Sequence, residues 1–188
     1  MRLRFGTGLL AAGLALAIAT PSYAGLITSF EGGLGNFATV AGGTTLSVGP
    51  VGATDGTNAL AIHATVPGWF DQAQDTTTST VSQLLGNSVV KADVTILPTE
   101  MTGATYAQVV FVIQGDGLAW TQSDNAAAFP DTVKDVPIDG LPHTVSWNYS
   151  SVTIPATPTW WNFILVTNTD ATDATFHIDN VRTEALAA

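Results

Sequence analysis

The fold class is decided by a segment that alternates in polarity, Ser88–Leu97, with the sequence SVVKADVTIL. Lys91 and Asp93 fall on one side of this segment when the chain is extended. The opposite side then carries the apolar residues Val90, Ala92, Val94 and Ile96. A period of two residues is typical of a strand with one face in the core and one face in solvent. The segment is therefore predicted to be a half-buried β-strand.

Strand patterns extend outward from this segment in both directions. Asn58–Val66 and His143–Tyr149 alternate in the same way, and the first of them is expected to turn Leu60, Ile62, Ala64 and Val66 to the core. Tyr106–Ile113 is apolar on both faces except at Gln108, as expected for a central strand covered on both sides. Further strands are predicted at Leu26–Phe30, Thr44–Val48, Gly117–Gln122, Trp161–Thr167 and Ala174–Thr183.

Helical periodicity is nearly absent. One short helix is plausible at Thr80–Leu85, ended by Gly86, and no segment keeps a 3.6-residue period over three turns. The sequence instead predicts about nine or ten short strands separated by Gly, Pro, Asn and Asp. This pattern predicts an all-β fold, an antiparallel β-sandwich or barrel.

The N-terminus carries the features of a removable secretion signal. Arg2 and Arg4 precede an apolar run at Leu9–Ala19, and Ser22 and Ala24 form a small-x-small cleavage pattern. The apolar run is too short for a membrane span, which needs about 20 residues. We therefore expect a signal peptide at residues 1–24, a secreted or extracellular protein without a membrane span, and a single β-sandwich domain at residues 25–188.

Composition excludes several classes of function. The 188 residues include no Cys, which excludes a disulfide framework, a thiol nucleophile and cysteine-ligated zinc. The net charge of −10 becomes −12 without Arg2 and Arg4. Nucleic acid is therefore not an expected partner, because phosphates are bound by clustered Lys and Arg. The same acidic balance disfavours acidic glycans, which the protein would repel.

Two segments near the ends of the chain carry a family resemblance. They are Ser29–Phe37 (SFEGGLGNF) and Phe176–Arg182 (FHIDNVR), with Asp55–Leu60 (DGTNAL) between them. In this order they resemble the β-sandwich carbohydrate-binding modules of the jelly-roll, galactose-binding-like type. The resemblance implies a jelly roll in which the first and last strands are neighbours. It also implies non-catalytic binding of a glycan.

The resemblance further implies a structural Ca²⁺ ion beside the first and last strands. The implied ligands are the carboxylates of Glu31 and Asp179 and a backbone carbonyl near Thr57. Ca²⁺ takes 6–8 oxygen ligands and accepts this mixture of donors. The alternative is that Glu31 caps a turn and that Asp179 accepts hydrogen bonds from backbone N–H groups of the adjacent loop.

The five tryptophans are divided between core and surface by strand alternation. Trp147 and Trp161 share strand faces with apolar neighbours and are predicted to lie in the core. Because adjacent residues of an extended chain point to opposite faces, Trp160 is expected on the opposite face from Trp161. Sugars stack their apolar faces on aromatic rings, while amides bind their hydroxyls. The predicted carbohydrate-binding residues are Trp69 and Trp120, helped by Tyr106, Gln74 and Gln122.

Three classes of function stay open at this point. The first is a non-catalytic module that binds a neutral polysaccharide or a cell-surface glycan. The second is a structural or adhesive β-sandwich of the cell surface or matrix. The third is a jelly-roll glycan hydrolase or lyase, which we disfavour because most acidic residues lie in turn sequences and basic residues are scarce.

Overall fold

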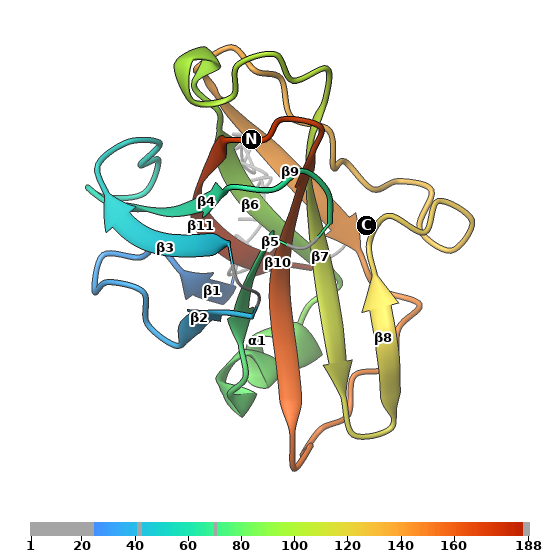
Figure 1. Ribbon diagram of the computed structural model, residues 1–188. Helices are drawn as coiled ribbons and strands as arrows, with labels where there is room; N and C mark the ends of the chain where they lie inside the picture. Colours follow the sequence, from blue (N-terminus) through green and yellow to red (C-terminus); the bar gives the residue numbers. More distant parts are fainter. Residues whose placement is uncertain (1–24, 41–42, 70, 186–188) are drawn as a thin grey trace, which may run out of the picture.

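A computed structural model describes residues 25–40, 43–69 and 71–185. Within these ranges it has eleven strands, one short helix and two 3₁₀ turns (Figure 1). The helix α1 is Val81–Leu85 and the turns are Thr78–Thr80 and Pro98–Glu100. The strands are β1 Gly25–Thr28, β2 Phe37–Thr39, β3 Thr44–Gly49, β4 Ala59–Ala64, β5 Asp71–Asp75, β6 Val89–Thr95, β7 Ala107–Gly115, β8 Leu118–Gln122, β9 Pro142–Asn148, β10 Trp161–Thr169 and β11 Ala174–Glu184.

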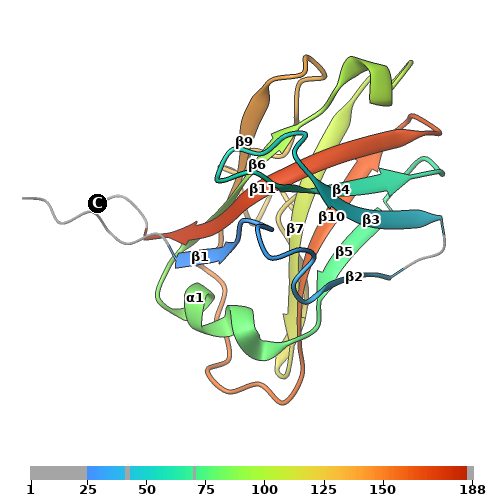
Figure 2. The ribbon, with the colours of Figure 1, turned by 90° about the vertical axis from the view of Figure 1, so that its left-hand side faces the viewer.

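The strands form two antiparallel sheets that pack as the layers of a sandwich (Figure 2). The six-stranded sheet has the order β3-β4-β11-β6-β9, and β1 pairs with β11 beside this path. The five-stranded sheet has the order β2-β5-β10-β7-β8. Because Leu26 of β1 lies opposite Arg182 of β11, the first and last strands are neighbours. The predicted antiparallel sandwich is confirmed.

The core lies between the two sheets and contains the side chains that strand alternation assigned to it. Trp147 on β9 and Trp161 on β10 are both buried, as predicted. Phe163 of β10 contacts both Phe37 and Phe111, with ring centroids 6.4 Å and 6.3 Å apart. Burial of this many apolar side chains is the main stabilising term for a domain of this size.

Two strands were not predicted from the sequence. β5 has the polar sequence DQAQD, which is typical of a turn, and it becomes a strand because it pairs with β10 along its whole length. β2 has only three residues and pairs with β5 at the edge of the sheet. Neither segment carries enough local pattern to be recognised, since both owe their strand conformation to a partner distant in sequence.

Two predicted boundaries are wrong. Val66 was expected to face the core, but β4 ends at Ala64 and Val66 is exposed before the turn that contains Gly68. The first strand was expected to include Phe30, but it ends at Thr28. The chain then turns sharply, with a φ of 56° at Phe30, and the Phe30 ring enters the core.

Two aspartates fasten surface loops to the sheet ends. Asp116, after β7, accepts hydrogen bonds from the backbone N–H and the hydroxyl of Thr159 and from the N–H of Trp160. Asp170, after β10, accepts hydrogen bonds from the hydroxyl and the N–H of Thr105 at 2.5 Å and 2.8 Å. These hydrogen bonds hold the pKa of both carboxyls below the ordinary range. The largest contribution comes from the threonine hydroxyl, Thr159 for Asp116 and Thr105 for Asp170, and the N–H donors add to it.

Stability is therefore expected to fall in acid. A carboxyl with a lowered pKa in the folded state stabilises the fold above its unfolded pKa of about 3.9, and this stabilisation is lost as the pH falls below that value. We expect the melting temperature to drop between about pH 5 and pH 3, measured by circular dichroism. Asp116→Asn and Asp170→Asn should weaken this dependence, while Asp131→Asn, an exposed control, should not. An unchanged pH profile in the combined variant would contradict the assignment.

Candidate ligand-binding site

The outer face of the five-stranded sheet carries a second apolar cluster. Val110 and Val112 of β7 and Ile164 and Val166 of β10 pack together on the side away from the core, and all four are buried. They alternate with core residues such as Phe111, so β7 is apolar on both faces, as predicted. Neighbouring side chains therefore already cover this apolar outer face of the sheet.

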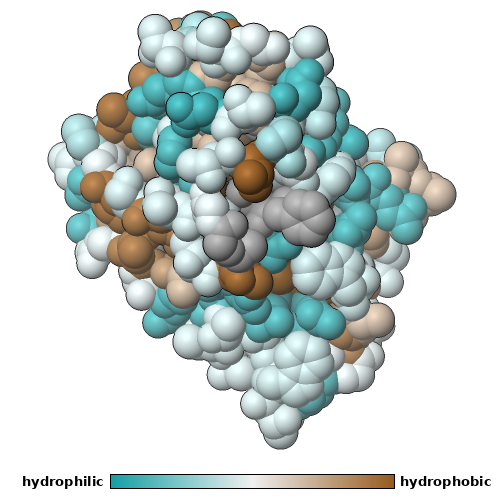
Figure 3. All heavy atoms as spheres, in the orientation of Figure 1, coloured by the Kyte–Doolittle hydropathy of each residue, from teal (hydrophilic) through white to brown (hydrophobic). Residues whose placement is uncertain are grey.

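A hollow of about 270 Å³ lies over this cluster, and we call it the sheet hollow. Its floor is formed by Val110, Val112 and Val166. Its remaining lining comes from the aromatic and polar side chains of Trp69, Gln72, Trp120, Gln122 and Asp124. Figure 1 shows β10, β7 and β8 side by side, and Figure 3 shows the same side with apolar groups separated by hydrophilic ones.

Two exposed tryptophans border the sheet hollow, one on the edge strand β8 and one in the turn before β5. Trp120, on β8, is 44% exposed, and its Nε1 donates a hydrogen bond to Oε1 of Gln122 at 2.6 Å. Trp69, before β5, is 41% exposed. The turn before it is tied to the sheet because the N–H of Gly68 donates to the carbonyl of Thr169 at 3.0 Å. Both rings are therefore exposed to solvent, and the backbone that carries each ring is held to the sheet by hydrogen bonds.

Amide side chains flank the apolar floor. Gln72 of β5 lies opposite Val166 of β10, and Gln122 of β8 lies opposite Val112 of β7. An apolar floor with aromatic walls and a few amides suits a ligand that has both apolar faces and many hydroxyls.

The structure brings together three of the five predicted binding residues. Trp69, Trp120 and Gln122 line the sheet hollow, whereas Gln74 and Tyr106, both in the described part of the chain, do not line it. Gln74 lies opposite Ile164, on the same outer face. Tyr106 is exposed, and its hydroxyl donates to Oδ1 of Asn168 at 3.3 Å.

Sequence reasoning missed two polar residues of the hollow. Gln72 belongs to β5, which was not predicted, so its placement depended on the pairing with β10. Asp124 was interpreted as a solvated turn residue, although its atom Oδ1 is buried and has no hydrogen-bond partner. The sequence carries no signal that separates Asp124 from the other aspartates in turns.

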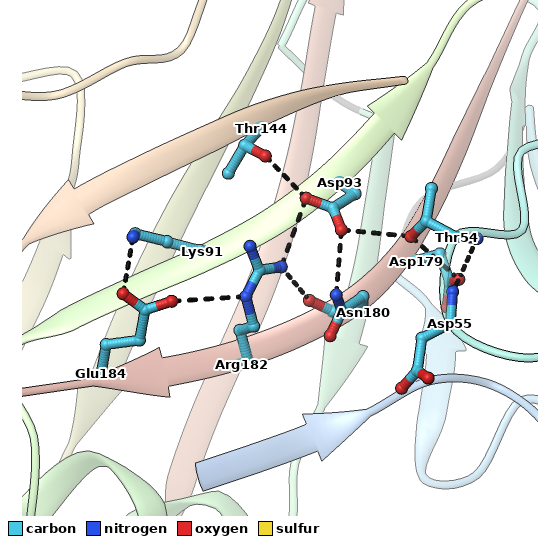
Figure 4. A network of polar contacts seen from close by, with 9 residues as sticks. All are labelled: Thr54, Asp55, Lys91, Asp93, Thr144, Asp179, Asn180, Arg182 and Glu184. Atoms are coloured by element: carbon cyan, nitrogen blue, oxygen red, sulfur yellow. Dashed lines mark hydrogen bonds and ion pairs between the residues drawn. The ribbon is translucent and has the colours of Figure 1, made fainter. Parts of the chain in front are cut away.

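The two carboxylates implied for Ca²⁺, Glu31 after β1 and Asp179 on β11, both accept hydrogen bonds from backbone N–H groups of the loop between β3 and β4, as the alternative stated. Glu31 accepts hydrogen bonds from the N–H of Thr57 at 2.8 Å, the N–H of Asn58 at 2.7 Å and the hydroxyl of Thr57 at 2.9 Å. The N–H bond from Thr57 is the main reason that the pKa of Glu31 is below its ordinary value. Oδ2 of Asp179 accepts hydrogen bonds from the N–H groups of Thr54 and Asp55 at 2.6 Å and 2.7 Å (Figure 4).

One atom of this region fits a cation. Oδ1 of Asp179 is fully buried and has no hydrogen-bond partner, so a cation there would satisfy it. Within the described ranges no three His, Asp or Glu side chains gather as a metal site. Ligands besides carboxylates, such as main-chain carbonyls and water, would have to complete the coordination.

A charged network covers the outer side of β6 and β11 (Figure 4). Arg182 lies between Asp93 at 3.2 Å and Glu184 at 3.4 Å, and Lys91 bonds Glu184 at 2.6 Å. Although burial alone would raise the pKa of Asp93, the hydrogen bond from Thr144 and the charge of Arg182 lower it. Both basic residues are thus engaged with carboxylates of the protein.

The fold has clear counterparts among solved structures. No family model matches the sequence, and no curated protein matches it. The chain has the β-sandwich, jelly-roll fold of carbohydrate-binding modules. A family 22 xylan-binding domain from Paenibacillus barcinonensis Xyn10C aligns with a TM-score of 0.53 and 15% identity, covering 90% of this chain and 99% of that chain.

Two further structures show the same likeness. A family 28 module specific for non-crystalline cellulose aligns with a TM-score of 0.55 and 18% identity, covering 88% of this chain and 97% of that chain. The family 27 module of Caldicellulosiruptor saccharolyticus, solved with mannohexaose, aligns with a TM-score of 0.54 and 16% identity, covering 88% and 99%. At these identities the likeness establishes the fold.

Proposed function

We propose that this chain is a secreted, non-catalytic carbohydrate-binding module that recognises a neutral polysaccharide or cell-surface glycan by aromatic stacking. The observation that carries the proposal is the sheet hollow, in which exposed Trp69 and Trp120 stand beside an apolar floor with Gln72 and Gln122. Stacking on the rings supplies affinity, and the amides bind hydroxyl groups.

Charge and fold support a neutral glycan. The chain has a net charge of −10, and Lys91 and Arg182 are engaged in ion pairs within the protein. An acidic polysaccharide would therefore be repelled. The solved modules with the same fold include one that binds xylan, one specific for non-crystalline cellulose and one in complex with mannohexaose. All three are neutral or largely neutral glycans.

Secretion rests on the N-terminal sequence. The predicted signal peptide, residues 1–24, lies outside the described residues. In the part of the chain that the structure describes, no helix has the length and apolar character to cross a membrane.

Affinity electrophoresis of residues 25–188 tests the function. Gels containing soluble xylan, mannan or a cellulose derivative should retard the protein, and a gel containing an acidic polysaccharide should not. Pull-down with insoluble cellulose and xylan extends the test to solid substrates. Failure to bind any neutral polysaccharide would overturn the proposal, and self-association in the same experiment would favour the structural or adhesive alternative.

We also propose that Asp179, Glu31 and a carbonyl near Thr57 hold a structural Ca²⁺ ion, which would fix the loop between β3 and β4. Adding Ca²⁺ in place of a chelator should raise the melting temperature by about 5 °C or more, as expected for about 2.7 kcal/mol of linkage at saturating ion. Asp179→Asn should lose this response, and Asp131→Asn should keep it. An unchanged melting temperature in the wild-type protein would contradict the ion.

A further inference from the structure

A separate hollow lies at one end of the six-stranded sheet. We call it the threonine hollow; its volume is about 400 Å³, and among the described residues it shares no lining residue with the sheet hollow. His63 of β4 and Thr175 of β11, which lie opposite each other in the sheet, are its strand residues. The rest of the lining comes from the segment that follows β6 and from the turn between β10 and β11. The two hollows therefore belong to different sheets.

Threonine side chains make up most of this lining. Besides Thr175, they are Thr99, Thr102 and Thr172, all three of which are exposed. The hydroxyls of these three have no hydrogen-bond partner among the described residues, so each can donate to and accept from a ligand. In the described part of the chain, no aromatic ring other than the His63 imidazole lines the hollow. The threonine hollow therefore offers hydrogen bonds rather than a stacking surface.

Two carboxylates from different turns also line the threonine hollow. Glu100 is held by His177, which is buried and whose Nε2 lies 2.5 Å from Oε2 of Glu100. The loop between β3 and β4 covers His177, because a Cβ atom at Gly52 would lie 2.5 Å from the Cβ of His177. Asp173 has an exposed side chain, and its Oδ1 lies 3.6 Å from Nε2 of His63. One carboxylate is thus fixed by a buried contact, and the other can adjust to a ligand.

The chemistry of this lining favours a ligand that is both cationic and hydroxylated. Carboxylates accept hydrogen bonds and do not donate them, and charged donors bind them more strongly than neutral ones. No Lys or Arg among the described residues lines the hollow, and the net charge of −10 attracts cations. A bare metal ion fits less well, because no three His, Asp or Glu side chains of the described ranges gather as a metal site. A lysine side chain would place methylene groups against the threonine hydroxyls.

We propose that the threonine hollow binds a protonated amino sugar of a glycan. The carboxylates of Glu100 and Asp173 accept hydrogen bonds from the ammonium group, and the threonine hydroxyls bind the hydroxyls of the sugar. The proposal goes beyond the function proposed above, because it adds a second site, on the other sheet, for a ligand that carries positive charge. Since this site has no stacking surface, its affinity depends on charge and falls as salt is added.

Isothermal titration calorimetry with a glucosamine tetramer, in its ammonium form and at low salt, tests this site. The matched ligand is the N-acetylglucosamine tetramer, which has the same linkage without the charge and should bind at least tenfold more weakly. Asp173→Asn should weaken binding of the glucosamine tetramer about threefold, as expected for an exposed charge pair. Glu100→Gln should weaken it about tenfold, as expected for a hydrogen bond to a charged acceptor. Asp131→Asn, which removes an equal charge outside the hollow, should bind like the wild-type protein.

Two further variants keep the result independent of folding and of the sheet hollow. Glu100→Gln alters a contact with buried His177, whereas the exposed side chain of Asp173 can be changed without loss of stability, so Asp173→Asn should keep the wild-type melting temperature. Trp120→Ala should bind the glucosamine tetramer like the wild-type protein. Because no neutral polysaccharide enters this experiment, its outcome is separate from that of the proposed function.

Several results would overturn the amino-sugar site. Absence of binding by the wild-type protein, or equal affinity for the two tetramers, would show that the ammonium group is not recognised. A loss in Trp120→Ala without a loss in Asp173→Asn would place the ligand in the sheet hollow. An equal loss in Asp131→Asn and Asp173→Asn would indicate attraction to the net charge alone. Tighter binding of Nα-acetyl-lysine amide than of glucosamine would assign the hollow to a lysine of a protein partner instead.

Discussion

Replacing Trp161 by alanine is expected to lower the free energy of unfolding by about 3–5 kcal/mol, the usual cost of deleting a buried tryptophan. Trp161 is 1% exposed, and its Nε1 donates to Oγ1 of Thr80 at 2.9 Å. Its ring packs so closely on β7 that a Cβ atom at Gly115 would lie 2.6 Å from Cε3 of the indole. Truncation therefore creates a cavity and leaves the buried Thr80 hydroxyl without this donor.

The adjacent residue is a matched control for this prediction. Trp160 is 45% exposed, so Trp160→Ala should change the free energy of unfolding by about 0.5 kcal/mol or less. Urea unfolding followed by tryptophan fluorescence and circular dichroism measures both variants. Trp161→Phe should lie between them, since it keeps a ring but loses the hydrogen bond. Equal destabilisation by Trp160→Ala and Trp161→Ala would contradict the assignment of the two faces.

The two tryptophans also show why the fold was largely predictable from the sequence. Strand alternation depends only on the spacing of side chains along the chain, so it placed Trp161 in the core and Trp160 outside without knowledge of any partner strand. The same reasoning found β7 and its two covered faces. It failed for β5, whose sequence DQAQD has no apolar face of its own and is a strand only because β10 lies beside it.

The site was less predictable because it depends on register between strands. Trp69 and Trp120 were recognised as aromatic residues in polar, turn-rich surroundings. Choosing between Gln72 and Gln74 required the pairing of β5 with β10, which sets Gln72 against Val166 in the sheet hollow. Asp124 was indistinguishable in sequence from the many aspartates of turns. Its unpartnered oxygen is visible only in three dimensions.

Loss of polysaccharide binding is expected when either tryptophan of the sheet hollow is truncated. Trp69→Ala and Trp120→Ala should each weaken binding about 30-fold, as expected for aromatic residues that contribute about 2 kcal/mol to binding. Trp120→Ala also removes the donor that holds Gln122 at 2.6 Å, so it should have the larger effect. The measurement is the retardation of each variant in gels containing the polysaccharide that the wild-type protein binds.

Trp160→Ala provides the control for stacking as such. Trp160 is as exposed as Trp69 and Trp120 but does not line the sheet hollow. If glycans adsorbed nonspecifically to any exposed tryptophan, all three variants would lose affinity to a similar degree. If binding takes place in the sheet hollow, only Trp69→Ala and Trp120→Ala will lose affinity, and both variants will keep melting temperatures close to the wild-type value. The comparison of Trp120→Ala with Trp160→Ala therefore separates a shaped site from adventitious adsorption.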